Sequence, residues 1–344
     1  MTTMLLDRPD PIRDDLTRRR LLGAGLGAGV GLALTGCTSN EPAAAPSASP
    51  TAEAGWSFTD DRGTTVSLPA RPQRIAAYEI AAGPLRFLGA PVVAVFGGRP
   101  LDQSAHLDGL DLAGISSAGA VIGEVNYEVL IELEVDLIVT LFNADQPAVF
   151  GFNDAPAQAK AERIAPIVAL DGTEDRGATM TRFVDLASSV GADQQAPALS
   201  AARRRYTDAQ EAMRAATAAK PGLRALAIRL DPQAGTVTFI GPYELYPQLQ
   251  QFADLGLDLA EFTGGRETAS LEEISKYRGD LLLVDAFSNL PAVAELPLWT
   301  ELPAVKAGQT VPFQPLARYR HDQVAAEIEA VVAAVRAANA ALVP

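Results

Sequence analysis

Cysteine and histidine are nearly absent from this chain of 344 residues, which contains one cysteine and two histidines. The single thiol, Cys37, leaves no partner for a disulfide within the chain. With histidine only at His106 and His321, the sequence argues against a zinc site built from His and Cys and against a Ser–His–Asp hydrolase. It also lacks the glycine-rich P-loop motif, so any ATPase linked to its function must be another chain.

Positive charge is scarce as well. After residue 36 the chain carries 23 basic and 38 acidic residues, a net charge of −15. Nucleic-acid binding depends on basic patches that neutralise phosphates. The composition therefore argues against nucleic acid as a partner.

The N-terminus has the pattern of an export signal. Arginines at positions 18–20 precede residues 21–36, which carry no charge and are rich in glycine and alanine. This apolar run is shorter than the roughly 20 residues that a membrane-spanning helix needs. We predict a signal peptide over residues 1–36. The arginines after Thr17 resemble the twin-arginine export signal.

Cys37 lies at the end of this signal, in the sequence Leu34-Thr35-Gly36-Cys37. These four residues resemble the bacterial lipobox, in which the cysteine is acylated and becomes the mature N-terminus. The residues that follow, up to 55, are mainly Ala, Pro, Ser, Thr and Glu, a composition typical of a disordered tether. The resemblance implies that residues 37–55 hold an exported domain at the outer face of the cytoplasmic membrane.

From residue 56 onward, strand and helix patterns alternate, which is typical of an α/β fold with parallel sheets. A hairpin is predicted over residues 56–68. Residues 193–219 lack glycine and predict one long, rigid helix that ends before Pro221-Gly222. We expect two Rossmann-like α/β lobes, over residues 56–192 and 220–344, joined by this helix with a ligand cleft between them.

The two lobes share a pattern. Glu128 lies eight residues before Asp136, and Glu272 lies eight residues before Asp280. Each segment predicts a helix, a short turn and a buried strand. Each lobe also has a helix that ends in a Leu-Gly pair, at residues 88–89 and 255–256. The matched spacing favours an internal duplication.

Several segments of the folded part carry a family resemblance: "IGEVNYEVLIELEVDLIVT", "RIAPIVAL" and, most specifically, "LPLWTELPAVKAGQTV". With the signal, lipobox and two lobes, they resemble the substrate-binding lipoproteins of ABC importers, in the iron–siderophore and cobalamin group. The resemblance implies a monomeric binding protein and no enzyme. Its ligand is a ferric siderophore whose iron is held by the chelator, so no cofactor or protein metal site is expected. Its partner is a permease dimer with a separate ATPase.

In that family an exposed glutamate on each lobe docks into arginine pockets of the permease. Glu128 and Glu272 occupy the matching motif positions. Two carboxylates on one face suit a pair of arginine pockets. A glutamate in the first turn of a helix also simply complements the helix dipole, and this alternative stays open.

A ferric siderophore offers an oxygen-rich surface with organic arms, which aromatic faces and arginine guanidinium groups suit. We therefore select aromatic and arginine side chains near predicted strand ends as ligand-binding candidates. They are Tyr78, Phe96, Arg99 and Phe142 in the first lobe, and Arg229, Tyr243, Tyr246, Phe287, Arg318 and Tyr319 in the second. Any of these aromatics suits a core position equally well, and Trp299 is expected to pack within the "LPLW" segment.

Two other functions remain open from the sequence. The same fold could carry cobalamin or haem, although haem normally takes a His or Tyr axial ligand. The chain could also be a cell-envelope lipoprotein with a signalling or partner role and no transport function. The matched pair Glu128 and Glu272 argues against this last alternative.

Overall fold

The structure, a computed structural model, describes residues 55–173, 175–241, 246–260, 266–288, 290–294, 296–314, 316–340 and 342. The predicted signal peptide, Cys37, the tether up to residue 54 and the candidate Tyr243 lie outside the described residues. Residues 52–344 form one compact unit. Within the described ranges no helix has both the length and the apolar character needed to cross a membrane.

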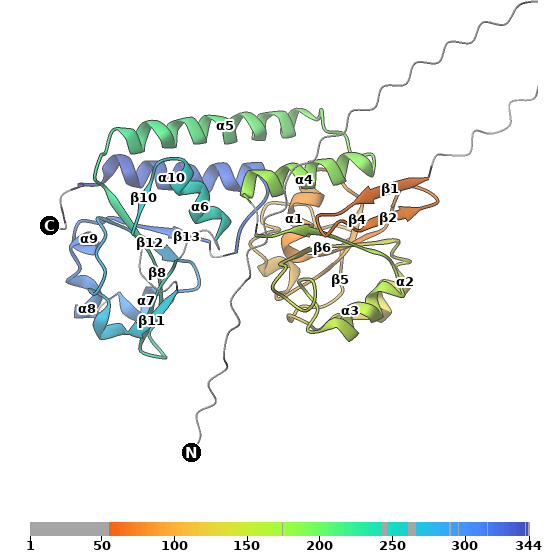
Figure 1. The fold of residues 1–344 in the computed structure, drawn as a ribbon, viewed down its shortest axis with the longest axis horizontal. Helices are drawn as coiled ribbons and strands as arrows, with labels where there is room; N and C mark the ends of the chain where they lie inside the picture. Colours follow the sequence, from red (N-terminus) through yellow and green to blue (C-terminus); the bar gives the residue numbers. More distant parts are fainter. Residues whose placement is uncertain are drawn as a thin grey trace, which may run out of the picture. The chain divides into compact units, whose positions relative to one another are not determined.

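The N-terminal lobe is built on a parallel sheet of five strands (Figure 1). The central strands are buried along most of their length because their sequences are continuous apolar runs, as in sheets covered on both faces. The order across the sheet is β5 (Ser116–Ser117), β4 (Val92–Phe96), β3 (Ile75–Tyr78), β6 (Leu137–Phe142) and β7 (Ile167–Asp171). The helices of this lobe are α1 (Glu79–Phe87), α2 (Tyr127–Glu132), α3 (Ala155–Glu162) and α4 (Arg176–Ser189), with a 3-10 turn η1 (Leu101–Gln103).

The predicted hairpin is confirmed as β1 (Trp56–Thr59) paired antiparallel with β2 (Thr65–Leu68). Asp60 holds its turn by accepting hydrogen bonds from the backbone N–H groups of Arg62 and Thr64. The other Asp60 oxygen accepts from the N–H of Ala169 in β7. The hairpin is thereby attached to the edge of the first sheet.

The C-terminal lobe contains a mixed sheet, not the purely parallel one that we expected. Its order is β11 (Glu267–Ser270), β9 (Thr236–Phe239), β8 (Arg224–Asp231), β12 (Leu281–Asp285) and β13 (Thr310–Phe313), with β10 (Asp258–Leu259) also pairing with β8. Strands β9 and β11 run antiparallel to their neighbours. The link between β8 and β9, residues 232–235, is too short for the crossover that a parallel pair requires.

Short helices cover the second sheet: α6 (Pro247–Asp254), α7 (Leu290–Val293), α8 (Pro297–Thr300) and α9 (Pro303–Lys306). Trp299 in α8 is buried in a cluster with Val293 and Ala304, as predicted for the "LPLW" segment.

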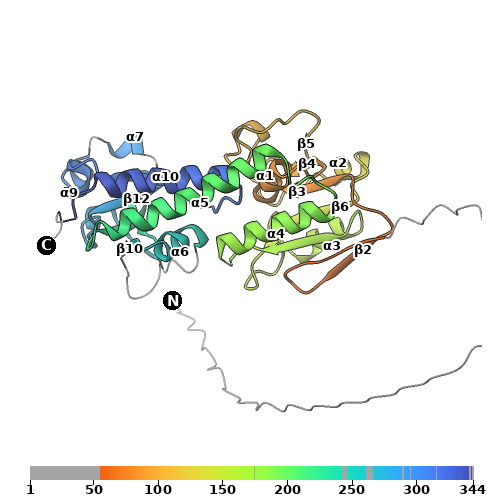
Figure 2. The same ribbon diagram turned by 90° about the horizontal axis from the view of Figure 1, so that it is seen from above.

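The long helix α5 (Pro197–Ala218) begins at a proline, which suits the first turn of a helix, so it is shorter than the predicted range 193–219. It does not join the lobes alone. Helix α10 (His321–Ala337) lies beside it in both views (Figures 1 and 2). A single apolar core continues from the first sheet, through these helices, to one face of the second sheet.

A buried polar cluster ties the two lobes together beneath these helices. Arg176, at the start of α4, is fully buried. It donates hydrogen bonds to Gln251 of α6 and, over 2.5 Å, to Glu327 of α10. Gln251 in turn donates to the hydroxyl of Tyr206 in α5. Four helices from both lobes therefore share one hydrogen-bond network.

Two matching contacts agree with the predicted internal duplication. Asp136 precedes β6 and exchanges backbone and carboxylate hydrogen bonds with Arg74, at the start of β3. Asp280 precedes β12 and makes the same pair of contacts with Arg224, at the start of β8. Within each lobe the aspartate therefore links two neighbouring strands, β6 to β3 in the first lobe and β12 to β8 in the second.

The helices before these strands differ between the lobes, contrary to the prediction of two equivalent helices. Residues 127–132 form α2, whereas Leu271–Glu273 form only a 3-10 turn, η3. The Asn126 side chain accepts hydrogen bonds from two backbone N–H groups at the start of α2, while Ser270 accepts only from Glu272 N–H. The weaker cap accompanies the shorter turn.

Candidate functional site

Two cavities lie between the lobes, on either side of Leu316, which lines both and is 40% exposed. The smaller, of about 180 Å³, is lined by Glu79, Arg99, Gln103, Ala105 and His106 of the first lobe and by Ala286, Phe287 and Gln314 of the second. The larger, of about 270 Å³, has Tyr78, Leu141, Phe150, Tyr246 and Tyr319 among its lining residues. Both adjoin the carboxyl ends of parallel strands, where open α/β sheets bind ligands.

Phe287 lines the smaller cavity from the loop after β12 and is 44% exposed. The guanidinium carbon of Arg99, from the first lobe, lies 5.2 Å from its ring centroid. The guanidinium carbon of Arg229, from β8, lies 5.5 Å from the same centroid. Two cations from opposite lobes therefore lie within cation–π distance of the Phe287 ring, and of these Arg99 lines the smaller cavity whereas Arg229 lines neither cavity.

Arg229 is held in place by Asp285, at the end of β12. Its Nε and Nη2 atoms both lie 2.5 Å from Asp285 Oδ2, and the Asp285 side chain is fully buried. The other carboxylate oxygen accepts a hydrogen bond from the N–H of Phe287. Asp285 therefore orients both the arginine and the aromatic ring that faces it.

His106 lines the smaller cavity, and Arg318, which lines neither cavity, lies close enough for its charge to act on the imidazole. Nε of Arg318 is buried and has no hydrogen-bond partner among the described residues, and burial lowers the pKa of its guanidinium. Burial, with the nearby charges of Arg318 and Arg99, lowers the pKa of His106 to about 4. The imidazole is thus neutral near pH 7. Its loop is held by Arg320 and Gln323 of the second lobe, which donate to the carbonyls of Asp108 and Ala105.

We expect acid to destabilise the protein through His106. Because its pKa is lowered to about 4 in the folded state, only the unfolded chain binds a proton between pH 6.5 and pH 4. The free energy of unfolding should therefore fall as the pH falls through this range, by roughly 3 kcal/mol in all for this group. The free energy of unfolding, measured with urea at several pH values between 7 and 4.5, should fall less steeply with falling pH for His106→Gln than for the wild type. An identical pH dependence of the two proteins would contradict the prediction.

Aromatic side chains dominate the larger cavity. Burial, followed by the charge of Glu79, raises the pKa of Tyr78 to about 12. Burial also raises the pKa of Tyr319, whose hydroxyl donates to the carbonyl of Gly172 over 3.3 Å. Tyr246, before α6, completes this wall. The phenols of Tyr78 and Tyr319 stay protonated near neutral pH, so these two residues offer aromatic faces and neutral hydroxyl groups to the cavity.

Two of the sequence-selected aromatics lie elsewhere. Phe96 is 1% exposed and packs between Tyr78 and Phe152, so it is a core residue. Phe142 does not line either cavity, whereas its neighbours Leu141 and Asn143 line the larger one. Side chains alternate along a strand, so Phe142 points to the other side of the chain.

Sequence reasoning missed four polar residues of the smaller cavity: Glu79, Gln103, His106 and Gln314. Of these, Glu79 follows β3 directly, and a charged residue right after a buried strand was the one usable signal. The sequence separation of the four residues hides that they share a cavity.

The candidates Glu128 and Glu272 are both exposed, in the first turns of α2 and η3. In the part of the chain that the structure describes, neither side chain makes a hydrogen bond or ion pair. They are therefore free to contact another molecule.

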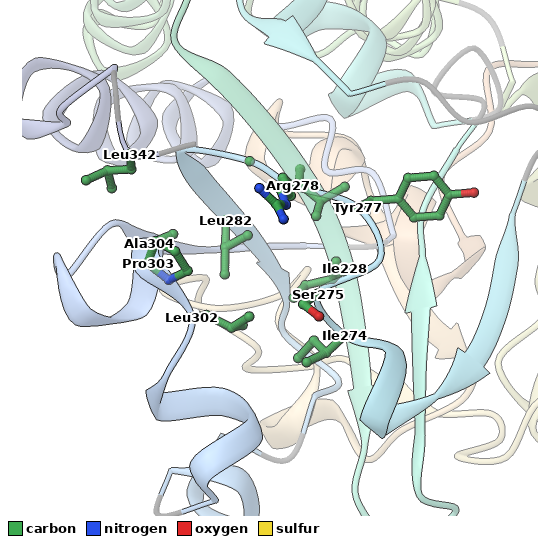
Figure 3. Close-up of a pocket in the computed structure, with 12 residues that line it drawn as sticks. Ile228, Ile274, Ser275, Tyr277, Arg278, Leu282, Leu302, Pro303, Ala304 and Leu342 are labelled. Atoms are coloured by element: carbon green, nitrogen blue, oxygen red, sulfur yellow. The ribbon is translucent and has the colours of Figure 1, made fainter. Parts of the chain in front are cut away.

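A third cavity, of about 220 Å³, lies within the second lobe and contains none of the candidate residues (Figure 3). Its wall is largely apolar, with side chains from β8, β12 and α9 such as Ile228, Leu282 and Ala304. Among its described lining residues, Arg278 alone carries a full charge. The two cavities between the lobes are better candidates for a ligand site, because arginines lie near Phe287 of the smaller one and aromatic side chains line the larger one.

No family model and no curated protein matches the sequence. Solved structures do match. DesE, a ferric-siderophore receptor protein from Streptomyces coelicolor, is 28% identical with a TM-score of 0.75, covering 83% of this chain and 99% of its own. The siderophore periplasmic binding protein from the fuscachelin gene cluster of Thermobifida fusca is 20% identical, with a TM-score of 0.57 and coverages of 78% and 98%.

PiuA, an iron uptake ABC transporter substrate-binding protein from Streptococcus pneumoniae, is 19% identical, with a TM-score of 0.59 and coverages of 80% and 97%. At 19% and 20% sequence identity, the similarity of PiuA and of the Thermobifida protein to this chain shows a shared fold alone. The chain therefore has the fold of siderophore and iron-uptake substrate-binding proteins of ABC transporters. DesE is described as a receptor protein, and the Thermobifida and Streptococcus proteins are described as binding proteins.

Proposed function

We propose that this protein is an extracytoplasmic lipoprotein that captures a ferric siderophore between its lobes and delivers it to the permease of an ABC importer. The observation that carries the proposal is the convergence of Arg99 and Arg229, from different lobes, on the exposed ring of Phe287. The similarity to DesE, whose described role is that of a ferric-siderophore receptor, supports it.

The two cavities suit the chemistry of such a chelate. The guanidinium groups can donate hydrogen bonds to iron-bound oxygens, which are electron-rich. The rings of Phe287, Tyr78 and Tyr246 can contact the organic arms. The chelator satisfies the coordination of the iron, so the protein needs to recognise only the outer surface of the complex.

Native mass spectrometry tests the proposal directly. The purified protein is mixed with a panel of ferric hydroxamate and ferric catecholate chelates, each paired with its iron-free form. We expect at least one ferric chelate to bind one-to-one, and more tightly than its iron-free form. Failure of the whole panel would overturn the proposal, and a Soret band in the purified protein would point to haem instead.

Arg229→Ala is expected to weaken binding of the chelate that this panel identifies by about tenfold or more, because a charge-assisted contact is lost. The buried carboxylate of Asp285 also loses its partner, so the melting temperature should fall. Arg224→Ala is the matched control, since Arg224 lies on the same strand in an exposed ion pair with Asp258. Isothermal titration calorimetry should show normal affinity for the control. Equal affinities for both variants would contradict the assigned role of Arg229.

Cys37 is proposed as the lipid-modified residue that tethers the protein to the membrane. Cells expressing the full chain and fed a clickable fatty acid should label the wild type and not Cys37→Ala. The wild type should also sediment with membranes, while Cys37→Ala should be released. Equal labelling of both chains would end this part of the proposal.

A further inference from the structure

Glu79 is a buried carboxylate that has no role in the proposed binding of the chelate, in which arginines bind its iron-bound oxygens. It is the first residue of α1, is 4% exposed and lines the smaller cavity between the lobes. Its Oε1 atom accepts a hydrogen bond from the N–H of Gly98 over 3.3 Å. Its Oε2 atom is buried and has no hydrogen-bond partner among the described residues.

The surrounding backbone is shaped to admit this carboxylate. A Cβ atom at Gly97 would lie 2.7 Å from the Cγ of Glu79 and 2.9 Å from its Cβ. Such distances are far below van der Waals contact, so glycine at position 97 makes room for the Glu79 side chain. A buried carboxylate oxygen without a donor is unfavourable and calls for an explanation.

No cation of the described residues neutralises Glu79. Within the described ranges it takes part in no ion pair. Arg99 lines the same cavity but stacks on Phe287. Arg229 is paired with Asp285. The cavity thus combines cationic groups on the side of Phe287 with an unpaired acceptor at Glu79.

We propose that the carboxylate of Glu79 accepts a charge-assisted hydrogen bond from a protonated amine of the bound chelate. The inference rests on the proposed function, and it narrows the ligand to ferric chelates that carry an ammonium group outside the iron-binding oxygens. The arginines face the oxygen-rich part of such a ligand, while Glu79 accepts from its cationic arm. Charge-assisted hydrogen bonds are the stronger class, so Glu79 acts as a specificity-determining residue.

The test uses two ferric trihydroxamate chelates that differ only in a terminal primary amine, which is free in one and acetylated in the other. Calorimetry with the wild-type protein should give about tenfold tighter binding of the free-amine chelate. Glu79→Gln keeps an oxygen for the N–H of Gly98 but loses the negative charge, so its preference should disappear. Glu162→Gln, an exposed change on α3, is the matched control and should retain the full preference.

The outcomes separate this inference from the proposed function. If the wild type binds both chelates equally, the inference is overturned while the proposed function stands. If Glu79→Gln still prefers the free amine tenfold, the bulk of the acetyl group explains the difference and the inference is again overturned. If the wild type binds no chelate of the wider panel, the proposed function itself fails. Should Glu79→Gln not fold, a third chelate in which a hydroxyl group replaces the terminal amine separates charge from bulk with the wild-type protein, and equal binding of the amine and hydroxyl chelates would overturn the inference.

Discussion

Replacing Glu128 and Glu272 together by alanine is expected to abolish iron uptake through this protein in cells and to leave its affinity for the chelate unchanged. Both carboxylates are exposed, at corresponding positions of the duplicated lobes. Exposed carboxylates can dock bidentately on arginines of a partner. Loss of a partner for a desolvated arginine costs on the order of 2–5 kcal/mol per site. Two such losses together would prevent stable docking on a permease.

The double variant should fold normally, because each glutamate adds at most a helix-dipole interaction of about 0.3–1 kcal/mol. Growth on the ferric chelate as iron source measures uptake, and calorimetry measures affinity. Glu132→Ala combined with Glu273→Ala is the matched control, because both residues are exposed neighbours of the docking pair. Normal growth of the double variant, or a loss of its affinity, would show that these residues are not a separate docking site.

Arg176→Met is expected to destabilise the folded protein strongly. The arginine is fully buried and donates to Gln251 and Glu327, which lie on different helices. Its removal leaves a buried carboxylate and amide oxygen without these donors, which typically costs about 3–5 kcal/mol. Urea unfolding should therefore show a much lower midpoint. The chelate affinity should fall as well, because Glu327 also lies near Arg318 and the loop of Gln314.

Two further variants test whether the loss of stability in Arg176→Met comes from the buried cluster. Arg204→Met alters an exposed arginine on α5 and should leave the unfolding midpoint nearly unchanged. Arg176→Met combined with Glu327→Gln removes the stranded charge and should recover part of the lost stability, as replacing both members of a buried pair often does. If Arg176→Met unfolds at the wild-type midpoint, the cluster does not hold the lobes together.

The secondary structure could be predicted where the signal is local. Strands β6 and β12 are short apolar runs bounded by aspartate, and α5 is a glycine-free amphipathic segment. The matched spacing of Glu and Asp indicated a feature common to both lobes, because Asp136 and Asp280 make the same backbone contact in each lobe. Prediction failed at η3, where a helix-like pattern yields only a single turn. It failed also for β9, whose antiparallel pairing follows from a short connection.

The site was predictable only as a set of residue types. Tyr78 and Phe96 are both aromatics at the ends of neighbouring strands, yet Tyr78 lines a cavity and Phe96 is packed behind it. Arg99 and Phe287 are far apart in the sequence and meet because the two lobes face each other. Glu79 and His106 gave little sequence signal, because their role depends on burial and on neighbours from other segments.

The sequence by itself determined the class of fold, the repeat of two lobes, the long helix and the kinds of side chain available for a ligand. These follow from hydrophobic periodicity, glycine and proline positions and residue chemistry, all of which act over a few neighbouring residues. Only the tertiary structure decided which arginines and aromatics share a cavity, and that Glu79 lies there with an unsatisfied oxygen. Those facts depend on how α5, α10 and the Arg176 cluster hold the lobes against each other, a balance of many contacts between distant segments.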